Sequence, residues 1–323
     1  MDVLPQRPLL ILDGAFFAHR SYHSRHTEPR EAFVRSVLNV IANEQPDFLA
    51  CAWDAEGPNY RHELYADYKS NRPEKEPALI EHLRDCLETL RTLRIAVYEA
   101  TGFEGDDVVA TLTRRWTRRG GRAIIYTADK DILQLVDGNT RVVIGEKQYR
   151  GDTVEEQFGV PPSLVSSFLA LAGDTADGIP GIPGIGPQSA SRLLQTFGSL
   201  EAMIEAAPNT SDRRLRGLAG REEELRLFHE LTKLSADVPM DVEDDDLVCH
   251  VHPENVSRQA DPELWEITRA FHHALDCYRE RSFVFAERLA LMHGQFQRRR
   301  DLFRAARRAV ARIDVHRSYT GRY

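Results

Sequence analysis

Acidic side chains are the residues of this sequence that could most directly do chemistry. Many of them stand where a predicted strand ends or a predicted helix begins, and the candidates are Asp13, Asp54, Glu104, Asp106, Asp107, Asp129, Asp131, Asp174 and Asp177. Carboxylates without histidine or cysteine are hard oxygen ligands suited to Mg²⁺ or Mn²⁺. Two such ions about 4 Å apart activate water and stabilise the leaving oxygen in phosphodiester cleavage. The pattern therefore favours a metal-dependent hydrolase if the acids converge.

Convergence of these acids is expected from their places beside the strands. Asp13 ends the first predicted strand, Asp54 follows the second, and Asp129 and Asp131 follow the fourth. In open α/β sheets the functional crevice lies beyond the carboxyl ends of the strands. Gathered acids need cations, because two unit charges about 4 Å apart repel by roughly 4 kcal/mol at an effective dielectric of 20. Taken singly, each acid could equally be a helix cap or a solvated surface residue.

A glycine-rich segment, residues 178–186, follows the last acidic pair and precedes a predicted helix over 187–197. Glycine lets backbone N–H groups approach a phosphate closely, and a helix start adds its dipole. The segment is therefore a candidate for a phosphate contact that does not depend on base sequence. A simple turn between two helices is the alternative interpretation.

Hydrophobic periodicity predicts the elements that must position these residues. In the first half, buried strands alternate with amphipathic helices, as in a largely parallel sheet. The expected strands are 9–12, 48–53, 95–98, 123–126 and 142–144, and the expected helices are 31–44, 77–93 and 105–118. After residue 153 only helices are expected, over 161–172, 187–197, 199–206, 221–235 and 261–276, with exposed connectors at 207–220 and 241–246. An α/β half followed by an all-α half is the predicted fold class.

Composition excludes several classes of protein. The 323 residues are 42% hydrophobic and 28% charged, and no apolar run approaches the length of a membrane span. The N-terminal apolar run is too short for a signal peptide, so a cytoplasmic location and no membrane partner are expected. The four cysteines stand singly, without the spacing of a zinc site or a disulfide framework.

Charge is divided unevenly along the chain. Residues 278–323 hold 12 Arg against 4 acidic residues, whereas the whole chain has a net charge of −8. Arg300, Arg304, Arg308 and Arg312 share one row of a predicted amphipathic helix. This basic extension could contact a duplex backbone, could dock a DNA polymerase, or could be a solvated terminal helix.

The acidic residues belong to a series of ordered motifs. In chain order these are Leu12-Asp13-Gly14, Trp53-Asp54-Ala55, Tyr60-Arg61-His62-Glu63, Tyr68-Lys69-Ser70-Asn71-Arg72, Phe103-Glu104-Gly105-Asp106-Asp107, Thr127-Ala128-Asp129-Lys130-Asp131, Gly173-Asp174-Thr175-Ala176-Asp177 and Pro180-Gly181-Ile182-Pro183-Gly184-Ile185-Gly186. Over about residues 8–240 the series resembles the bacterial and phage 5′-nucleases, which include the 5′-3′ exonuclease domain of DNA polymerase I and the flap endonucleases.

The resemblance implies a fold and two metal sites. A PIN-like α/β nuclease domain would be followed by a helix-three-turn-helix domain that holds duplex DNA. One divalent ion, Mg²⁺ or in its place Mn²⁺, would be lined by Asp13, Asp54, Glu104, Asp106 and Asp107, and a second site would be completed by Asp129, Asp131, Asp174 and Asp177. A potassium ion would lie between a DNA phosphate and the hairpin residues Gly181, Ile182, Gly184, Ile185 and Gly186.

The resemblance also implies catalytic side chains. Tyr68, Lys69 and Arg72 match positions at the base of a helical arch over the active site, where Lys and Arg hold the scissile phosphate. Arg20 matches another basic position near the site. From pattern alone, the three could instead be an exposed basic helix start. The arch, about residues 60–80, is expected to be short, because six residues separate Arg72 from Leu79. Gly178 replaces an Asn of the family pattern.

A structure-selective 5′-3′ exonuclease or flap endonuclease is therefore the expected function, acting on duplex DNA with a 5′ flap, nick or gap in replication or repair. The expected domains are residues 1–150, 151–245 and a basic extension over 246–323, without an attached polymerase. A non-catalytic protein that binds DNA junctions and a PIN-type ribonuclease are the alternatives. A protein that only binds DNA would benefit from losing negative charge near the phosphates, so the presence of all nine acids argues against the first alternative. The helical hairpin domain argues against the second.

Overall fold

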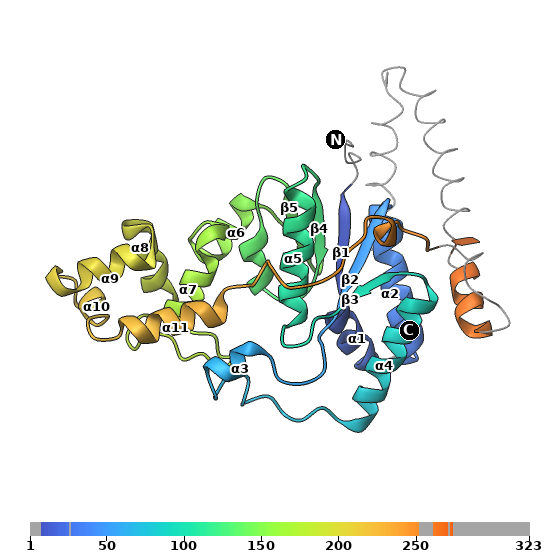
Figure 1. Cartoon of the computed structure of the whole chain (residues 1–323), viewed down its shortest axis with the longest axis horizontal. Coiled ribbons are helices and arrows are strands. Elements are labelled where there is room, and N and C mark those ends of the chain that lie inside the picture. Colours follow the sequence, from blue (N-terminus) through green and yellow to red (C-terminus); the bar gives the residue numbers. More distant parts are fainter. Residues whose placement is uncertain (1–7, 26, 252–260, 271, 274–323) are drawn as a thin grey trace, which may run out of the picture. The chain divides into compact units, whose positions relative to one another are not determined.

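The computed structural model describes residues 8–25, 27–251, 261–270 and 272–273 of the 323-residue chain (Figure 1). The chain divides into two compact units, residues 1–251 and residues 252–323. In the second unit the described residues form a helix over 262–270, whose first turn is capped by Asp261 Oδ1 accepting from the Leu264 N–H at 2.9 Å. The predicted basic helix that carries Arg300 and Arg312 lies outside the described residues.

A mostly parallel sheet forms the centre of the first unit, as predicted. Its six strands run in the order β3-β2-β1-β4-β5-β6. They are β1 (Leu9–Asp13), β2 (Phe48–Ala52), β3 (Ala96–Tyr98), β4 (Ala123–Tyr126), β5 (Thr140–Ile144) and β6 (Lys147–Tyr149). All pairs are parallel except β5 with β6. The sequence did not indicate β6, because this edge strand has only three residues, of which two are polar and exposed.

Different helices cover the two faces of the sheet (Figure 1). The helices of this half are α1 (Gly14–Tyr22), α2 (Pro29–Glu44), α3 (Tyr60–Leu64), α4 (Pro77–Thr92) and α5 (Gly105–Thr117). Helix α5 contacts β1, β2 and β4 and shares a buried core with Leu9 and Ile11. Because side chains alternate along a strand, Leu10 and Leu12 point to the opposite face. Helices α1, α2 and α4, which pack against one another, cover that face.

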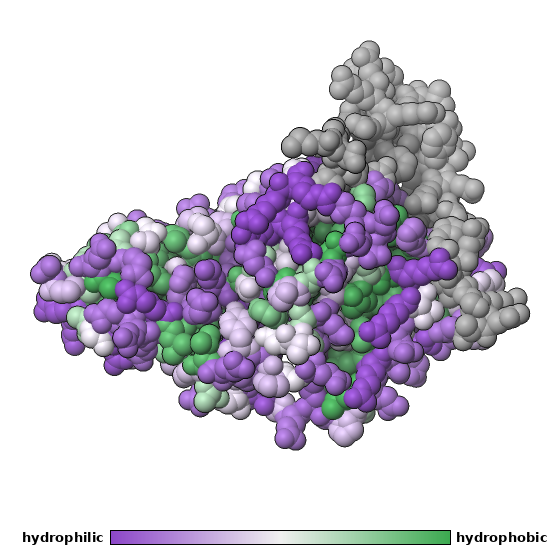
Figure 2. Space-filling model, in the orientation of Figure 1, coloured by the Kyte–Doolittle hydropathy of each residue, from purple (hydrophilic) through white to green (hydrophobic). Residues whose placement is uncertain are grey.

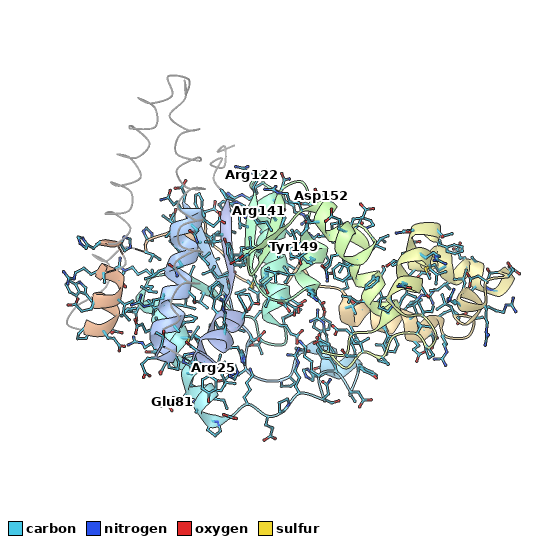
Figure 3. All side chains as sticks on the ribbon, turned by 180° about the vertical axis from the view of Figure 1, so that it is seen from behind. Arg25, Glu81, Arg122, Arg141, Tyr149 and Asp152 are labelled. Carbon is cyan, nitrogen blue, oxygen red and sulfur yellow. The ribbon has the colours of Figure 1, made fainter. Side chains whose placement is uncertain are left out.

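Polar contacts hold α2 beside the sheet. Glu44, the last residue of α2, accepts a hydrogen bond from the Tyr126 hydroxyl at 2.8 Å. It also pairs with Arg141 of β5 at 2.6 Å. Arg141 and Tyr149 mark the neighbouring strands β5 and β6 in the view from behind (Figure 3).

The described chain after β6 is helical, in agreement with the predicted second half. The elements are α6 (Gly151–Phe158), the 3-10 turn η2 (Pro162–Leu164), α7 (Val165–Ala172), α8 (Pro187–Phe197), α9 (Leu200–Ala206), η3 (Ala207–Asn209), α10 (Arg213–Arg216) and α11 (Glu222–Thr232). The expectation that 207–220 is an exposed connector is wrong. Leu215 and Leu218 are fully buried there and join the core.

A return segment, residues 233–251, leads from α11 back along α5 to the sheet (Figure 1). Arg119, two residues after the end of α5, pairs with Asp244 at 2.5 Å. Leu247 lies in the 3-10 turn η4 (Asp245–Leu247) and is buried in the core. Val248 forms an antiparallel bridge with Phe48 of β2. The return segment therefore joins the helical half to the sheet and is more than the exposed connector expected over 241–246.

The described surface is mainly polar. Figure 2 shows hydrophilic residues over most of the visible face, with smaller hydrophobic areas between them. None of the helices in the described part of the chain has the length and apolar character needed to span a bilayer.

Candidate active site

Two acids are fixed at the carboxyl ends of β1 and β2. Asp13 accepts a hydrogen bond from the Thr127 hydroxyl at 2.6 Å and one from the Phe16 N–H at 3.0 Å. It thereby also caps α1, a helix that the sequence did not indicate because it begins with Gly and is rich in aromatic residues. Asp54 accepts from the Gly105 N–H at 2.7 Å, which ties it to the start of α5.

The acids at this edge of the sheet are close enough to repel one another. Burial, together with the charges of Asp54 and Asp129, raises the pKa of Asp13 to about 6 although two hydrogen bonds oppose the rise. Burial and the charges of Asp129, Asp13 and Asp54 raise the pKa of Asp106 well above its usual value. The pKa of Asp129 is raised for the same reasons, by burial first and then by Asp177 and Asp174. The predicted convergence is therefore present at this edge of the sheet.

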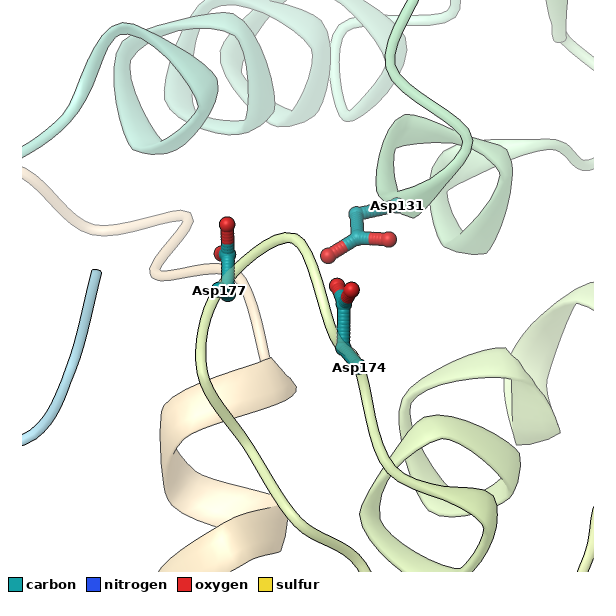
Figure 4. Close-up of side chains that lie close together, drawn as sticks. All are labelled: Asp131, Asp174 and Asp177. Atoms are coloured by element: carbon teal, nitrogen blue, oxygen red, sulfur yellow. The ribbon is translucent and has the colours of Figure 1, made fainter. Parts of the chain in front are cut away.

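A second group of acids lies beside the first. Carboxylate oxygens of Asp131, Asp174 and Asp177 all lie within 4.8 Å of one another (Figure 4). Asp131 begins the 3-10 turn η1 (Asp131–Leu135), and its N–H donates to Asp129 Oδ1 at 2.8 Å. Burial and the charges of Asp129, Asp174 and Asp177 raise the pKa of Asp131 well above its usual value. This arrangement also favours a bound cation.

Close backbone packing places the loop that carries Asp174 and Asp177. A Cβ atom at Gly181, whose φ is +68°, would lie 2.3 Å from the Gly173 nitrogen, so only glycine fits there. Asp174 and Ile179 exchange two backbone hydrogen bonds of 2.8 Å across the loop. The glycine-rich segment thus has a local structural role in addition to its predicted phosphate contact.

The rest of the glycine hairpin presents its backbone at the surface. Ile182 and Ile185 are 3% exposed and anchor the hairpin in the core. Gly184 and Gly186 are exposed, and Gly186 caps the start of α8. The five predicted hairpin residues therefore lie in one short segment with two apolar anchors and an accessible turn.

The predicted arch-base residues reach the acids. The Tyr68 hydroxyl lies 2.9 Å from Glu104 Oε2 and 3.0 Å from Asp177 Oδ2, and its single proton can be donated to either carboxylate. The Lys69 ammonium lies 2.5 Å from Glu104 Oε1 and 3.6 Å from Asp177 Oδ2. The Arg72 guanidinium lies 2.7 Å from Asp177 Oδ1. Tyr68 and Lys69 therefore connect the two groups of acids, whereas Arg72 contacts Asp177 of the second group.

The pKa values in this contact follow from the same charges. Burial lowers the pKa of Lys69, but the charges of Glu104 and Asp177 outweigh burial and leave it above its usual value. Burial likewise raises the pKa of Glu104, yet Lys69 and Arg61 outweigh burial and hold it below its usual value. Lys69 therefore stays an ammonium ion beside an ionised Glu104.

Asp107 and Arg20 make contacts of another kind than the arch-base residues. Asp107 is fully buried, and Arg61 engages both of its oxygens at 2.7 and 2.8 Å. Asp107 also accepts from the backbone N–H groups of Glu104 and Ser235. Because its lone pairs are already engaged, Asp107 has a structural role in place of the predicted metal-ligand role. Arg20 is exposed on α1, where its guanidinium lies 5.9 Å from the centre of the Phe16 ring.

Sequence reasoning missed three residues that orient the acids. Thr127 holds Asp13, and Asn59 donates from Nδ2 to Glu104 Oε1 at 2.9 Å. Arg61 donates to Glu104 and Asp107. Thr127 and Arg61 stood inside the quoted motifs, but their types alone did not reveal which acid each would meet.

The donor set fits divalent metal ions. Eight carboxylates remain after Asp107 is set aside, and the described group of Asp131, Asp174 and Asp177 contains no histidine or cysteine, whereas His19 lies near Asp54. The eight are Asp13, Asp54, Glu104, Asp106, Asp129, Asp131, Asp174 and Asp177. All-oxygen ligation of high charge suits Mg²⁺ or Mn²⁺.

Comparison with known families decides the relationship. Residues 8–159 match the N-terminal resolvase-like domain of 5′-3′ exonucleases, and residues 160–255 match the C-terminal SAM fold of 5′-3′ exonucleases. The chain belongs to the 5′-3′ exonuclease family. The resemblance that the ordered motifs indicated is thereby confirmed. The acidic site of this exonuclease has the oxygen ligands that a metal-dependent nuclease needs.

Relatives of this exonuclease occur alone and within polymerases. It is 32% identical over 252 residues to the 5′-3′ exonuclease of Aquifex aeolicus (strain VF5), covering 75% of this chain and 86% of the relative. It is 35% identical over 263 residues to DNA polymerase I of Pseudomonas aeruginosa, covering 76% of this chain and 29% of the polymerase. The exonuclease thus spans less than a third of that polymerase.

Solved structures confirm the predicted fold of the exonuclease. The bacteriophage T5 D15 flap endonuclease, in a complex with DNA and metal ions, matches with a TM-score of 0.64 and 20% identity over 84% of this chain and all of that one. The catalytic core of Rad2 with DNA substrate matches with a TM-score of 0.55 and 14% identity over 84% of this chain and 92% of that one. At these identities the likeness concerns the fold.

Proposed function

We propose that this exonuclease hydrolyses DNA phosphodiester bonds at or near the 5′ end of a strand in flapped, nicked or gapped duplexes. The observation that carries the proposal is the meeting of two acidic groups beside Lys69 and Arg72, in a chain of the 5′-3′ exonuclease family. In this proposal the exonuclease acts in DNA replication or repair, with a DNA polymerase as its partner.

Two Mg²⁺ ions are the proposed cofactors, with Mn²⁺ as a substitute. Asp13, Asp54, Glu104 and Asp106 would hold one ion, and Asp129 with the triad Asp131, Asp174 and Asp177 would hold the other. When bound, such ions supply an activated water and neutralise charge on the phosphate and the leaving oxygen. The raised pKa values of Asp13, Asp106 and Asp131 support this, because repelling carboxylates gain most from added positive charge.

Side chains of the arch base would hold the scissile phosphate. Lys69 pairs with Glu104 and Arg72 pairs with Asp177. A bound phosphate would replace these carboxylates as the ion-pair partner of both cations. An ammonium and a guanidinium placed there offset charge that develops on the phosphate in the transition state. Tyr68 would donate a hydrogen bond from its hydroxyl, and Arg20 would contact the phosphate backbone next to the site.

The glycine hairpin would hold the duplex part of the substrate. Gly181, Gly184 and Gly186 would offer backbone groups to a potassium ion and a DNA phosphate, while Ile182 and Ile185 keep the turn fixed in the core. Backbone contacts of this kind position DNA without reading its sequence. Selectivity would then depend on DNA shape.

A single cleavage assay tests the proposal. The full chain is incubated with a duplex that carries a fluorescent 5′ flap, with Mg²⁺ and then with EDTA. Cleavage near the flap junction in Mg²⁺ only is expected. Binding without cleavage in Mg²⁺ and in Mn²⁺ would support a DNA-junction binding protein instead, and preferential cleavage of an RNA flap would support a ribonuclease.

A further inference from the structure

Arg61 of α3 is a fully engaged cation inside the first unit. Its side chain is 1% exposed, and every N–H of the guanidinium has an acceptor. Nε donates to the Leu231 carbonyl at 2.9 Å, Nη1 to Glu104 Oε2 at 3.3 Å and to Asp107 Oδ2 at 2.7 Å, and Nη2 to Asp107 Oδ1 at 2.8 Å and to the Lys233 carbonyl at 3.0 Å. This one side chain therefore touches the acidic site and the end of α11.

The end of α11 is also attached to the elements that carry the second acidic group. The Thr232 hydroxyl donates to the Ser166 carbonyl of α7, the helix that leads into Asp174. Gln134, in the turn that begins with Asp131, donates to the Thr232 carbonyl at 3.1 Å and accepts from the Leu234 N–H at 3.1 Å. Residues 231–235 are therefore the common attachment of η1 and α7.

Arg61 links this attachment to the first acidic group. Glu104 stands at the start of α5, and the Ser235 N–H donates to Asp107 in the first turn of the same helix. The two groups of acids are thus joined by one short path, from Glu104 through Arg61 to α11 and from α11 to the loop and turn of the triad.

A buried ion pair is a costly way to obtain stability alone. Well-packed apolar side chains of similar volume often stabilise a fold as well as a buried Arg-carboxylate pair does. A guanidinium, however, fixes the relative positions of several acceptors because its donors have a rigid planar arrangement. The geometry of Arg61 is therefore better suited to holding separate segments in fixed relative positions than to packing alone.

We propose that Arg61 is a positioning residue that sets the spacing between the two groups of carboxylates and so couples the two metal sites. The inference rests on the proposed metal-dependent function. Arg61 itself does not touch the substrate; it acts through Glu104 and through the end of α11. Partners that orient metal ligands typically change metal affinity by about 10-fold to 100-fold when they are removed.

Calorimetric titration of the full chain with Mn²⁺ tests the proposal without turnover. Two variants are compared: Arg61→Lys, which cannot span the same acceptors, and the double variant Arg61→Met with Asp107→Leu, which removes both buried charges together. Arg119→Met is the matched control, because Arg119, just after α5, joins this part of the chain to the return segment by an ion pair of its own. We expect Mn²⁺ affinity to fall about 10-fold or more in the two Arg61 variants and to stay unchanged in the control.

The outcomes distinguish a failure of the positioning role from a failure of the proposed function. Variants that melt near the wild-type temperature and bind Mn²⁺ as the wild type does would overturn the positioning role. A wild-type chain that neither binds Mn²⁺ nor cleaves a 5′ flap would instead overturn the proposed function. Hydrogen-deuterium exchange on the unaltered chain gives a second measurement: added Ca²⁺ should slow exchange of the Ser235 amide several-fold, because Asp107 and Arg61 connect that amide to Glu104. An unchanged rate would contradict the proposal.

Discussion

Single residues of the active site are arranged around a shortage of positive charge. Eight carboxylates meet at the edge of the sheet, and among the described residues Lys69, Arg72 and Arg61 contact two of them directly, Glu104 and Asp177. Burial and the remaining repulsion keep the pKa values of Asp13, at the end of β1, and Asp106, in the first turn of α5, above their usual values. The protein is therefore prepared to gain stability and reactivity from added cations.

Replacing Lys69 by Met should lower the rate of cleavage. The ammonium that would offset charge on the phosphate is lost, so kcat is expected to fall about 10²-fold to 10³-fold while KM for the flap duplex changes little. Steady-state kinetics with saturating Mg²⁺ measure both constants. Lys147→Met, on the exposed edge strand β6, is the control that should keep wild-type kinetics. Equal kcat values for the Lys69 variant and the wild type would remove Lys69 from the catalytic residues.

The raised pKa of Asp13 gives a pH dependence with a definite sign. A carboxyl whose pKa rises from 3.8 to about 6 on folding binds its proton more tightly in the folded state, so its contribution to stability is lost as pH rises through that range. Without metal, Asp13→Asn should therefore gain stability relative to the wild type between about pH 4 and pH 7. Melting temperatures across this range measure the difference. The same scan of Glu81→Gln, on the exposed side of α4, should run parallel to the wild type.

The contribution of sequence reasoning differs between residues for a physical reason. Acids beside strand ends could be found because a parallel sheet brings its carboxyl ends to one edge. The family resemblance implied a metal-ligand role for Asp107, but the sequence pattern did not show that Arg61 would face it. The acceptors of Arg61 include the Leu231 and Lys233 carbonyls, and no residue type marks a backbone carbonyl 170 positions away.

Among the elements, those with long apolar periodicity were predictable and those fixed by local contacts were not. Strands β1, β2, β4 and β5 and helices α2, α4, α5 and α8 lie close to their predicted ranges. Helices α3 and α10 have only five and four residues, and their first turns depend on caps by Asn59 and Asp212. Such short helices have too few periodic positions to produce a pattern.

Gly181 tests how the loop of the second acidic group is held. Gly181→Ala would place a methyl group against the Gly173 backbone at a positive φ, so a loss of roughly 1–3 kcal/mol in the free energy of unfolding is expected, with a marked fall in cleavage. Urea unfolding and the flap assay measure the two effects. Gly184→Ala is the matched variant, since its φ is also positive but no atom lies within 4 Å of the added Cβ. If both variants behaved alike, close packing at Gly181 would not be what positions Asp174.

At the scale of the whole first unit, one core continues from the sheet through α5 into the helices. It includes Ile11 of β1, Leu171 of α7, Leu225 of α11 and Leu247 of the return segment. The predicted division near residue 150 therefore follows a change in secondary structure, whereas the hydrophobic core crosses it. Residues 1–251 accordingly form one compact unit.

Replacing Leu247 tests how much the return segment contributes to the stability of this unit. Leu247→Ala should destabilise the protein by about 2–5 kcal/mol, because it opens a cavity in the shared core. Denaturant unfolding, followed by both fluorescence and circular dichroism, should show a single lowered transition. Asp245→Ala, an exposed residue two positions earlier in the same turn, should leave the free energy of unfolding within about 0.5 kcal/mol of the wild-type value. A small effect at Leu247 would mean that the return segment contributes little to the unit.

The bridge between Val248 and Phe48 has a consequence for synthesis of the protein. A nascent chain grows from its N-terminus, so β2 emerges from the ribosome about 200 residues before its late partner. Asp174, Asp177 and the carbonyls that receive Arg61 also emerge late. We expect the unfinished polypeptide to remain inert toward nucleic acids around the ribosome and to acquire cleavage activity only once translation has passed residue 248.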